Sequence, residues 1–120
     1  KESKPLNIMT SYNKINGVWS HYNYDLVTTV LRKEWGYEGN VMTDWWMQKS
    51  ASPEFPSIKD NAYRVRAQVD VLMPGGKHSA KKYKSDGTLL ATIGKTDGIT
   101  RAELERTARN VLNLILKIKS

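Results

Sequence analysis

The sequence predicts an α/β fold in which short parallel strands alternate with helices. Three short apolar runs, at residues 6–11, 40–43 and 69–73, have the length and composition of buried strands. Apolar residues at helical spacing occupy the segments around them, and glycine or proline separates consecutive elements. Three strands are too few to form a covered sheet alone. We therefore expect about three parallel strands and three to four helices that belong to a larger α/β domain.

The first half of the chain contains a strand, a loop, a helix and a second strand. A polar, glycine-containing loop at residues 12–22 follows the first strand. Asn23 is expected to cap a helix, because the residues after it repeat apolar side chains at helical spacing. Gly36 suits the left-handed position just past that helix, and Gly39 leads into the strand at residues 40–43.

The second half is expected to begin with a Ser/Pro-rich loop that extends through Pro56. Ser57 can cap a helix whose buried side includes Ala62 and Val65. The third strand, residues 69–73, ends at the Pro-Gly-Gly sequence that follows it, a strong breaker. A short helix is expected at residues 88–93.

The last helix has the clearest signals at its start. Thr100 and Glu103 have the spacing of a capping box, and Ile99 and Leu104 have the spacing of a hydrophobic staple. One apolar stripe is expected to face the core, and it comprises Leu104, Ala108, Val111, Leu112 and Ile115.

Composition narrows the functional classes. Hydrophobic residues make up 39% of the 120 residues, too many for a disordered tail, and no apolar run is long enough to span a membrane. The absence of cysteine excludes disulfides, thiol nucleophiles and cysteine-based zinc sites. The first residues lack the apolar stretch of a signal peptide, which leaves a cytoplasmic or secreted location open. The net charge is +7, and the one dense basic run, residues 77–84, is either a solvated loop or an anion-binding patch.

Asp44 is the candidate catalytic residue on pattern alone. Catalytic and ligand-binding residues in parallel α/β folds lie at the carboxyl ends of strands, and Asp44 follows the second strand directly. The adjacent Trp45 and Trp46 offer apolar faces on which a sugar ring can stack, while a carboxylate binds sugar hydroxyls. A helix cap at the same position would also favour an aspartate, so the pattern leaves both interpretations open.

Three spaced segments resemble glycoside hydrolase family 3, which includes β-glucosidases and β-xylosidases. Residues 9–18 match M-x-S-Y-N-x-x-N-G-x, and residues 31–45 match L-R-x-E-W-G-[FY]-x-G-x-V-x-[ST]-D-W. Residues 67–75 are similar to A-G-x-D-x-x-M-P-G, and the last helix resembles the one that closes the family's barrel. The resemblance covers nearly the whole chain, and its motifs occur in the family's order.

The resemblance implies that residues 1–120 are the C-terminal fragment of a (β/α)8-type catalytic barrel domain. By this similarity Asp44 is the nucleophile of a retaining, exo-acting β-glycosidase, and Trp45 lines the sugar pocket. Tyr12 would lie close to the nucleophile and orient it or stabilise charge. Met9 is either a wall of the pocket or a core residue. The substrate would be a β-linked oligosaccharide or glycoside, and no cofactor or metal is expected.

The sequence departs from the family pattern at two positions. Trp46 stands where many relatives have a small residue, usually glycine, and it either widens the aromatic platform or packs on the following loop. Gln68 replaces the usual glycine of the third motif. Asp70 fits the motif but lies within a strand, so it is expected to be a structural hydrogen-bonding residue. His21 is expected to be a loop or packing residue and not a ligand.

The resemblance also implies that parts of the family's active site are missing from this sequence. The acid/base glutamate and the residues that grip the sugar hydroxyls normally come from other segments of the family, and the Lys-His pair at residues 77–78 occurs in the wrong place to replace them. We therefore expect the isolated chain to be inactive and to need the rest of the parent enzyme. Open sheet edges and uncovered apolar faces lead us to expect self-association.

Two other functional classes are alternatives for this sequence. A non-catalytic carbohydrate-binding module would use Trp45, Trp46 and Tyr12 as its platform. A nucleic-acid binder would use the positive charge and the aromatic residues, but no recognised motif supports it, so neither a nucleic-acid nor a membrane partner is expected.

Overall fold

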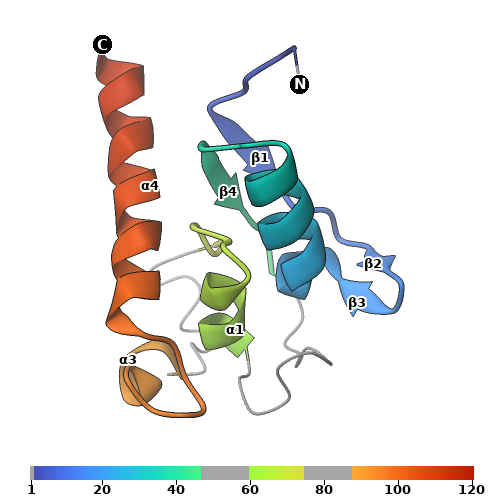
Figure 1. Ribbon diagram of the computed structural model, residues 1–120, viewed down its shortest axis with the longest axis vertical. Coiled ribbons are helices and arrows are strands. Elements are labelled where there is room, and N and C mark those ends of the chain that lie inside the picture. Colours follow the sequence, from blue (N-terminus) through green and yellow to red (C-terminus); the bar gives the residue numbers. More distant parts are fainter. Residues whose placement is uncertain (1, 47–59, 75–87) are drawn as a thin grey trace.

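A computed structural model describes residues 2–46, 60–74 and 88–120, and at its centre two strands pair in parallel (Figure 1). Strand β1 (Asn7–Met9) pairs with β4 (Asn40–Met42), and Ile8 lies opposite Val41. The α/β class with parallel strands is therefore confirmed. In Figure 1, α4 lies on one side of this pair and the helix that connects the two strands lies on the other.

The third predicted strand, residues 69–73, is reduced to a single parallel bridge between Val71 and Met42. Its first residue, Val69, does not pair with a strand. The Val69 N–H donates to the carbonyl of Arg64 at 3.1 Å and so extends the end of the preceding helix. The expectation of a full strand was wrong at its start, while the parallel direction was right.

The segment expected as a loop at residues 12–22 contains a hairpin. Strands β2 (Lys14–Ile15) and β3 (Val18–Trp19) pair antiparallel. Asn16 and Gly17 connect them with φ of 51° and 82°, the positive values that a tight two-residue hairpin turn requires. A short 3-10 turn, η1 (Ser20–Tyr22), follows directly.

The connecting helix η2 (Asp25–Glu34) has π-helical hydrogen bonding. Asn23 caps it as predicted, since its Oδ1 accepts a hydrogen bond from the Leu26 N–H at 2.9 Å. Gly36, with φ of 65°, lets the chain reverse toward β4, also as predicted.

Within the described ranges three further helices follow: α1 (Asp60–Arg66), α3 (Thr88–Thr92) and α4 (Arg101–Lys119). Both hydrogen bonds of the predicted capping box of α4 are present. Glu103 N–H donates to the Thr100 hydroxyl, and the Thr100 N–H donates to the Glu103 carboxylate at 2.7 Å. Both predicted staple residues lie in one core cluster, with Ile99 buried and Leu104 packed against it.

The apolar stripe predicted for α4 is wrong in its second half. Leu112 is 60% exposed, and Ala108 and Ile115 are exposed as well. The helix instead turns a more polar face inward. Arg106 donates to the carbonyl of Val65 at 2.7 Å, and Asn110 donates to the carboxylate of Asp70 at 2.9 Å. These two anchors fix the rotation of α4 about its axis.

Among the residues that the structure describes, buried side chains form two clusters that hold these elements together. One centres on Tyr22 and Tyr63, whose rings stack with centroids 5.7 Å apart, and it includes Ala62 and Val65 as predicted. The other joins η2, β4 and the bridging segment through Val27, Val41 and Val69. Each buried valine stabilises the fold by roughly 1.5–3 kcal/mol relative to an exposed one.

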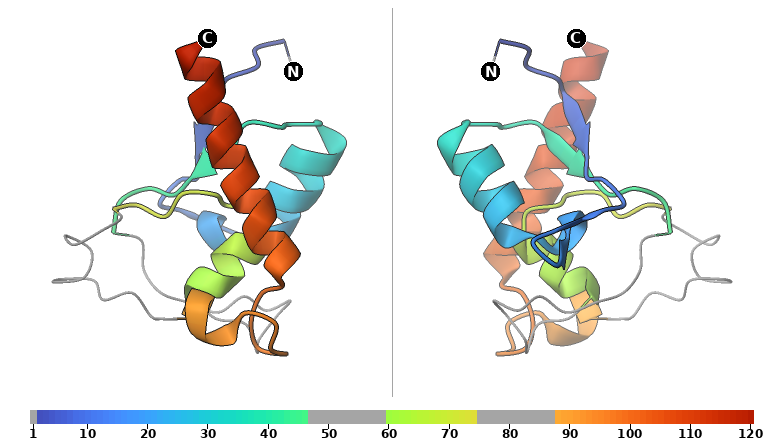
Figure 2. Two further views of the ribbon diagram at one scale, coloured as in Figure 1. Left: turned by 90° about the vertical axis from the view of Figure 1, so that its left-hand side faces the viewer. Right: turned by 90° about the vertical axis from the view of Figure 1, so that its right-hand side faces the viewer.

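Figure 2 shows α4 running across one face of the molecule, with α1 and α3 near its beginning. In the described ranges, none of the helices has the length and hydropathy needed to cross a bilayer. The predicted cap at Ser57 and the basic run at residues 77–84, with its Lys-His pair, lie outside the described residues.

Candidate active site

Three segments of the chain end together at one edge of the parallel pair. Thr10 N–H, just past β1, donates to the carbonyl of Met42 at 2.8 Å. Thr43 N–H, just past β4, donates to the carbonyl of Val71 at 2.9 Å. The Met73 N–H in turn donates to the Thr43 hydroxyl at 2.9 Å. These bonds fix the carboxyl ends of all three segments beside one another.

Asp44 leaves this edge directly after the buried Thr43. Its side chain is partly buried, and its Oδ1 accepts a hydrogen bond from the Trp45 N–H at 2.6 Å. Within the described ranges, Oδ2 has no hydrogen-bond partner and the carboxylate makes no ion pair. One oxygen is therefore held in place while the other is available to a ligand.

Trp45 and Trp46 lie next to this carboxylate. They are 46% and 48% exposed, and their rings meet edge to face with centroids 5.2 Å apart. Trp46 has a φ of 54°, a conformation that strains a bulky residue. Its N–H donates to the carbonyl of Met73 at 3.1 Å, so the left-handed turn is tied to the third segment.

Met9 and Tyr12 extend the same edge beyond β1. Met9 is 52% exposed at the end of its strand, so, of the two interpretations that the sequence leaves open, it is not a core residue of the described chain. Tyr12 is 41% exposed and packs edge to face on Trp19 with centroids 5.4 Å apart. The described residues show no hydrogen bond between Tyr12 and Asp44. Tyr12 thus lies just before the hairpin, and its ring packs against Trp19 of β3.

Two supporting residues were not singled out from the sequence. Thr43 positions the third segment through its hydroxyl, and Trp19 supports Tyr12 from the β2–β3 hairpin. The Asn-Gly pair at residues 16–17 was the available signal for that hairpin. No pattern in the sequence signalled the hydroxyl bond of Thr43, because it joins residues 30 positions apart.

Asp70 is structural, as predicted. Its Oδ2 accepts from Arg32 at 2.7 Å and from the Val41 N–H at 2.9 Å, while its Oδ1 accepts from Asn110. Burial raises the pKa of the Asp70 carboxyl, and these donors oppose that shift. The carboxylate joins η2, β4 and α4.

His21 is a packing residue, as predicted. It is fully buried, and its ring lies 4.6 Å from the ring of Tyr22 and 6.1 Å from that of Trp19, centroid to centroid. In the described part of the chain, no group of three or more His, Cys, Asp or Glu side chains is placed to hold a metal ion.

Sequence and structural comparisons agree on the relatives of this chain. Residues 2–114 match the family model described as "Glycosyl hydrolase family 3 N terminal domain". The chain is 40% identical over 117 residues to a beta-glucosidase of Ruminococcus albus. This alignment covers 97% of this chain and 12% of that protein. It is 36% identical over 121 residues to an exo-alpha-(1->6)-L-arabinopyranosidase of Bifidobacterium breve. This second alignment covers 100% of this chain and 14% of that protein.

The fold is similar to those of solved relatives. Beta-glucosidase 3B from Thermotoga neapolitana in complex with glucose superposes with a TM-score of 0.77 at 29% identity, over 97% of this chain and 15% of that chain. A beta-glucosidase from Paenibacillus barengoltzii superposes with a TM-score of 0.68 at 36% identity, over 92% of this chain and 12% of that chain. The chain therefore spans only a small part of the length of these relatives, and it belongs to glycoside hydrolase family 3.

Proposed function

We propose that this chain supplies the nucleophile-bearing part of a retaining, exo-acting β-glycosidase of the β-glucosidase type. The observation that carries the proposal is the position of Asp44, partly buried where three parallel segments end and next to two exposed tryptophans. Its family membership and its beta-glucosidase relatives support the same assignment.

In the proposed reaction Asp44 acts as the nucleophile in a double displacement. The free Oδ2 attacks the anomeric carbon, and the bond from that carbon to the leaving-group oxygen breaks while a second carboxylic acid donates a proton to that oxygen. Water, deprotonated by the same second group, then cleaves the glycosyl ester and restores the Asp44 carboxylate with net retention. The Trp45 N–H holds Oδ1 at 2.6 Å and so orients the attacking oxygen.

The second carboxyl group is proposed to come from another part of the parent enzyme. It must lie ~5–5.5 Å from the nucleophile in a retaining enzyme. Asp70, a buried carboxylate, is held by three donors on η2, β4 and α4 and is assigned to the framework. On this proposal the isolated chain does not turn over substrate.

Trp45, Trp46, Tyr12 and Met9 are proposed to form the wall of the sugar site. All four are between 41% and 52% exposed, although large apolar side chains gain by burial. A sugar ring presents apolar C–H faces that can cover such surfaces. The strained backbone of Trp46 supports a binding role, because residues in unfavourable conformations concentrate at functional sites.

We also propose that the described elements are the C-terminal portion of a (β/α)8 barrel. The parallel order of β1, β4 and the Val71 segment, with helices in the connections, supports this arrangement. Asp44 then lies at the carboxyl-terminal face, where active sites of this fold are built.

The test uses the full-length polypeptide that contains this sequence and an aryl β-glucoside as substrate. Asp44→Gly is expected to lose about 10³-fold or more in rate, since removal of a nucleophile abolishes the covalent step. Azide is expected to restore release of the aryl group and to form an α-glycosyl azide, because it attacks from the face that Asp44 occupied. Asp25→Gly, at an exposed residue of η2, is the control for general damage. Full activity of Asp44→Gly, or no rescue together with a native fold, would refute the assignment.

A non-catalytic carbohydrate-binding module is the alternative, favoured by the exposed pair of Trp45 and Trp46. It would act without a second carboxylate. A family 3 polypeptide that contains Asp44 and hydrolyses no aryl glycoside, while cellobiose quenches its tryptophan fluorescence saturably, would support this alternative.

A further inference from the structure

The hydroxyl of Ser20 joins the two residues on either side of Tyr12. Its Oγ donates a hydrogen bond to the carbonyl of Asn13 at 2.8 Å and lies 2.8 Å from the Oγ of Ser11. Because the Ser20 proton is used for Asn13, the Ser11 hydroxyl is the donor in the second bond. The Ser20 N–H also donates to the carbonyl of Asn13, at 3.0 Å. Ser20 therefore holds the chain both before and after Tyr12.

Ser20 is the buried partner of an exposed segment. It is 1% exposed, whereas residues 11–13 are exposed to solvent. These residues belong to neither β1 nor β2, so no strand ladder holds them in place. Hydrogen bonds to a buried hydroxyl are stronger than bonds at the surface, because the surroundings have a lower dielectric constant. The Ser20 bonds therefore take the place of a ladder for this segment.

The ring of Tyr12 is held by the same part of the chain. Trp19, the residue before Ser20, packs edge to face on it with centroids 5.4 Å apart. The Nζ of Lys14 lies 5.0 Å from the centroid of the Trp19 ring, and the centroid of the His21 ring lies 6.1 Å from it. The end of β3 thus holds the backbone of Tyr12 through Ser20 and its side chain through Trp19.

We propose that Ser20 is a positioning residue, which fixes Tyr12 at the edge where carbohydrate binds. At the start of the same segment, the Thr10 N–H donates to the carbonyl of Met42 in β4 at 2.8 Å. The segment is therefore tied to the strand before Asp44 at one end and to Ser20 at the other, and both ties set where Tyr12 lies relative to that carboxylate. The inference rests on the proposed function, because it takes Tyr12 as part of the wall of the sugar site.

The test is a double-mutant cycle in the full-length polypeptide that contains this sequence, with kcat/KM for an aryl β-glucoside as the measurement. Ser20→Ala is expected to lower kcat/KM about tenfold or more, since a small misplacement of a substrate-positioning group is costly. In Tyr12→Ala the same substitution should cost little more, because Ser20 acts only through Tyr12. A residue that merely stabilises the fold would lower kcat/KM by the same factor in both backgrounds.

Two further variants make the cycle decisive. Thr28→Val also removes a buried hydroxyl, which donates to the carbonyl of Ala67 at 3.0 Å and joins η2 to the end of α1. It should leave kcat/KM unchanged, because that bond holds no residue of the sugar site. Ser11→Ala is a substitution at an exposed residue that removes one of the bonds to Ser20. It should show a smaller loss with the same dependence on Tyr12, and it decides the question if Ser20→Ala does not fold.

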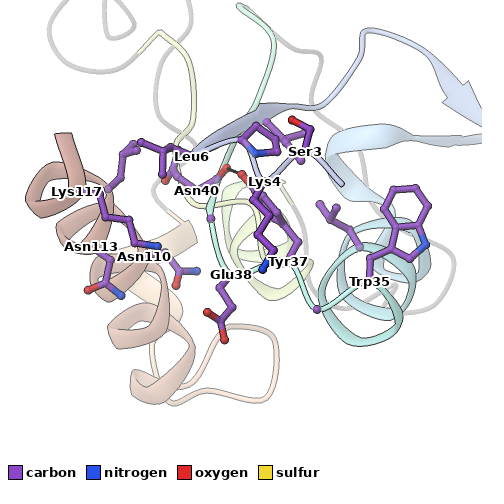
Figure 3. A pocket seen from close by; sticks show the side chains of 16 residues that line it. Ser3, Lys4, Leu6, Trp35, Tyr37, Glu38, Asn40, Asn110, Asn113 and Lys117 are labelled. Atoms are coloured by element: carbon purple, nitrogen blue, oxygen red, sulfur yellow. Dashed lines mark hydrogen bonds between the residues drawn. The ribbon is translucent and has the colours of Figure 1, made fainter. Parts of the chain in front are cut away.

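The same cycle is measured in the affinity for glucose by calorimetry, which does not require Asp44 to be catalytic. Glucose that bound instead in the cavity of about 380 Å³ where β1 and β4 begin would respond to neither substitution, because that cavity opens at the opposite end of the strands (Figure 3). Coupling of Ser20 and Tyr12 in either measurement supports the inference. Equal losses in both backgrounds, or no loss from Ser20→Ala and Ser11→Ala, would overturn it. An active Asp44→Gly variant would refute the proposed nucleophile and leave this coupling measurable.

Discussion

The guanidinium of Arg32 lies 2.7 Å from the carboxylate of Asp70, and both side chains are almost fully buried. Arg32 also donates to the carbonyls of Gly39 and Gln68, at 2.5 Å and 3.0 Å. Asp70 accepts from the Val41 N–H within the central strand. This one ion pair therefore fixes η2 against β4, the strand that carries Asp44 at its end.

We predict that Asp70→Asn lowers the free energy of unfolding by about 3 kcal/mol or more. The substitution leaves the Arg32 charge buried without a counterion, which costs more than the pair itself contributes. Urea denaturation monitored by circular dichroism measures the loss. Asp97→Asn, at an exposed aspartate, should change stability by less than about 0.5 kcal/mol. Equal stability of the two variants would show that the pair is not needed.

Gln68 has a φ of 71°, in the region that glycine adopts without strain. The family motif that this segment resembles has glycine at this position, which is the residue that suits such a conformation. We predict that Gln68→Gly raises the free energy of unfolding by about 0.5–1 kcal/mol, because relief of the left-handed strain exceeds the added chain entropy. Gln68→Ala retains the strain and should give no gain. Thermal unfolding of the two variants side by side distinguishes them.

Local signals in the sequence predicted the parts of the fold that depend on local hydrogen bonds. The capping box of Thr100 and Glu103 and the cap at Asn23 are both present, because each joins residues three positions apart. The placement of Asp44 at a strand end followed from the length of a single apolar run. Its role as nucleophile remains a prediction.

Non-local contacts account for what the sequence did not predict. Periodicity finds apolar residues on α4 but cannot tell which face has a partner, and the bond from Asn110 to Asp70 spans 40 positions. The third strand shortened because Val69 bonds to α1 instead of to a neighbouring strand. The cavity lined by Leu31 and Leu114 could not be predicted, because its walls come from segments far apart in the sequence.

The second half of α4 exposes a run of apolar side chains, and we predict that it drives self-association of the isolated chain. Leu112, Leu116 and Ile118 are 60%, 65% and 67% exposed. Leu112→Lys/Leu116→Lys should convert oligomers to monomers, as measured by light scattering at high concentration, because it places charge in the middle of this surface. Leu90→Lys, at an exposed residue of α3, should leave the oligomers intact. A monomeric unmodified chain at high concentration would contradict the prediction.

Glu103 gives the chain a defined sensitivity to acid. Burial raises the pKa of its carboxyl, but the hydrogen bonds from Arg66 at 2.7 Å and from Thr100 outweigh that effect and hold the pKa below its usual range. A carboxyl whose pKa is lower when folded stabilises the fold above its unfolded pKa of about 4.3, and this contribution is lost as pH falls through the folded value.

We therefore predict that Glu103→Gln lowers the free energy of unfolding by about 1–2 kcal/mol at pH 7, since Arg66 loses a charged acceptor. The difference from the unmodified chain should shrink as the pH falls below about 4, where protonation removes the same charge from Glu103 itself. Urea unfolding between pH 3 and 7 measures both effects. Glu105→Gln is the matched control, because the Glu105 carboxylate pairs with Arg101 at the exposed surface, and such pairs contribute little. A difference that stays constant across this pH range would show that the Glu103 charge does not stabilise the start of α4.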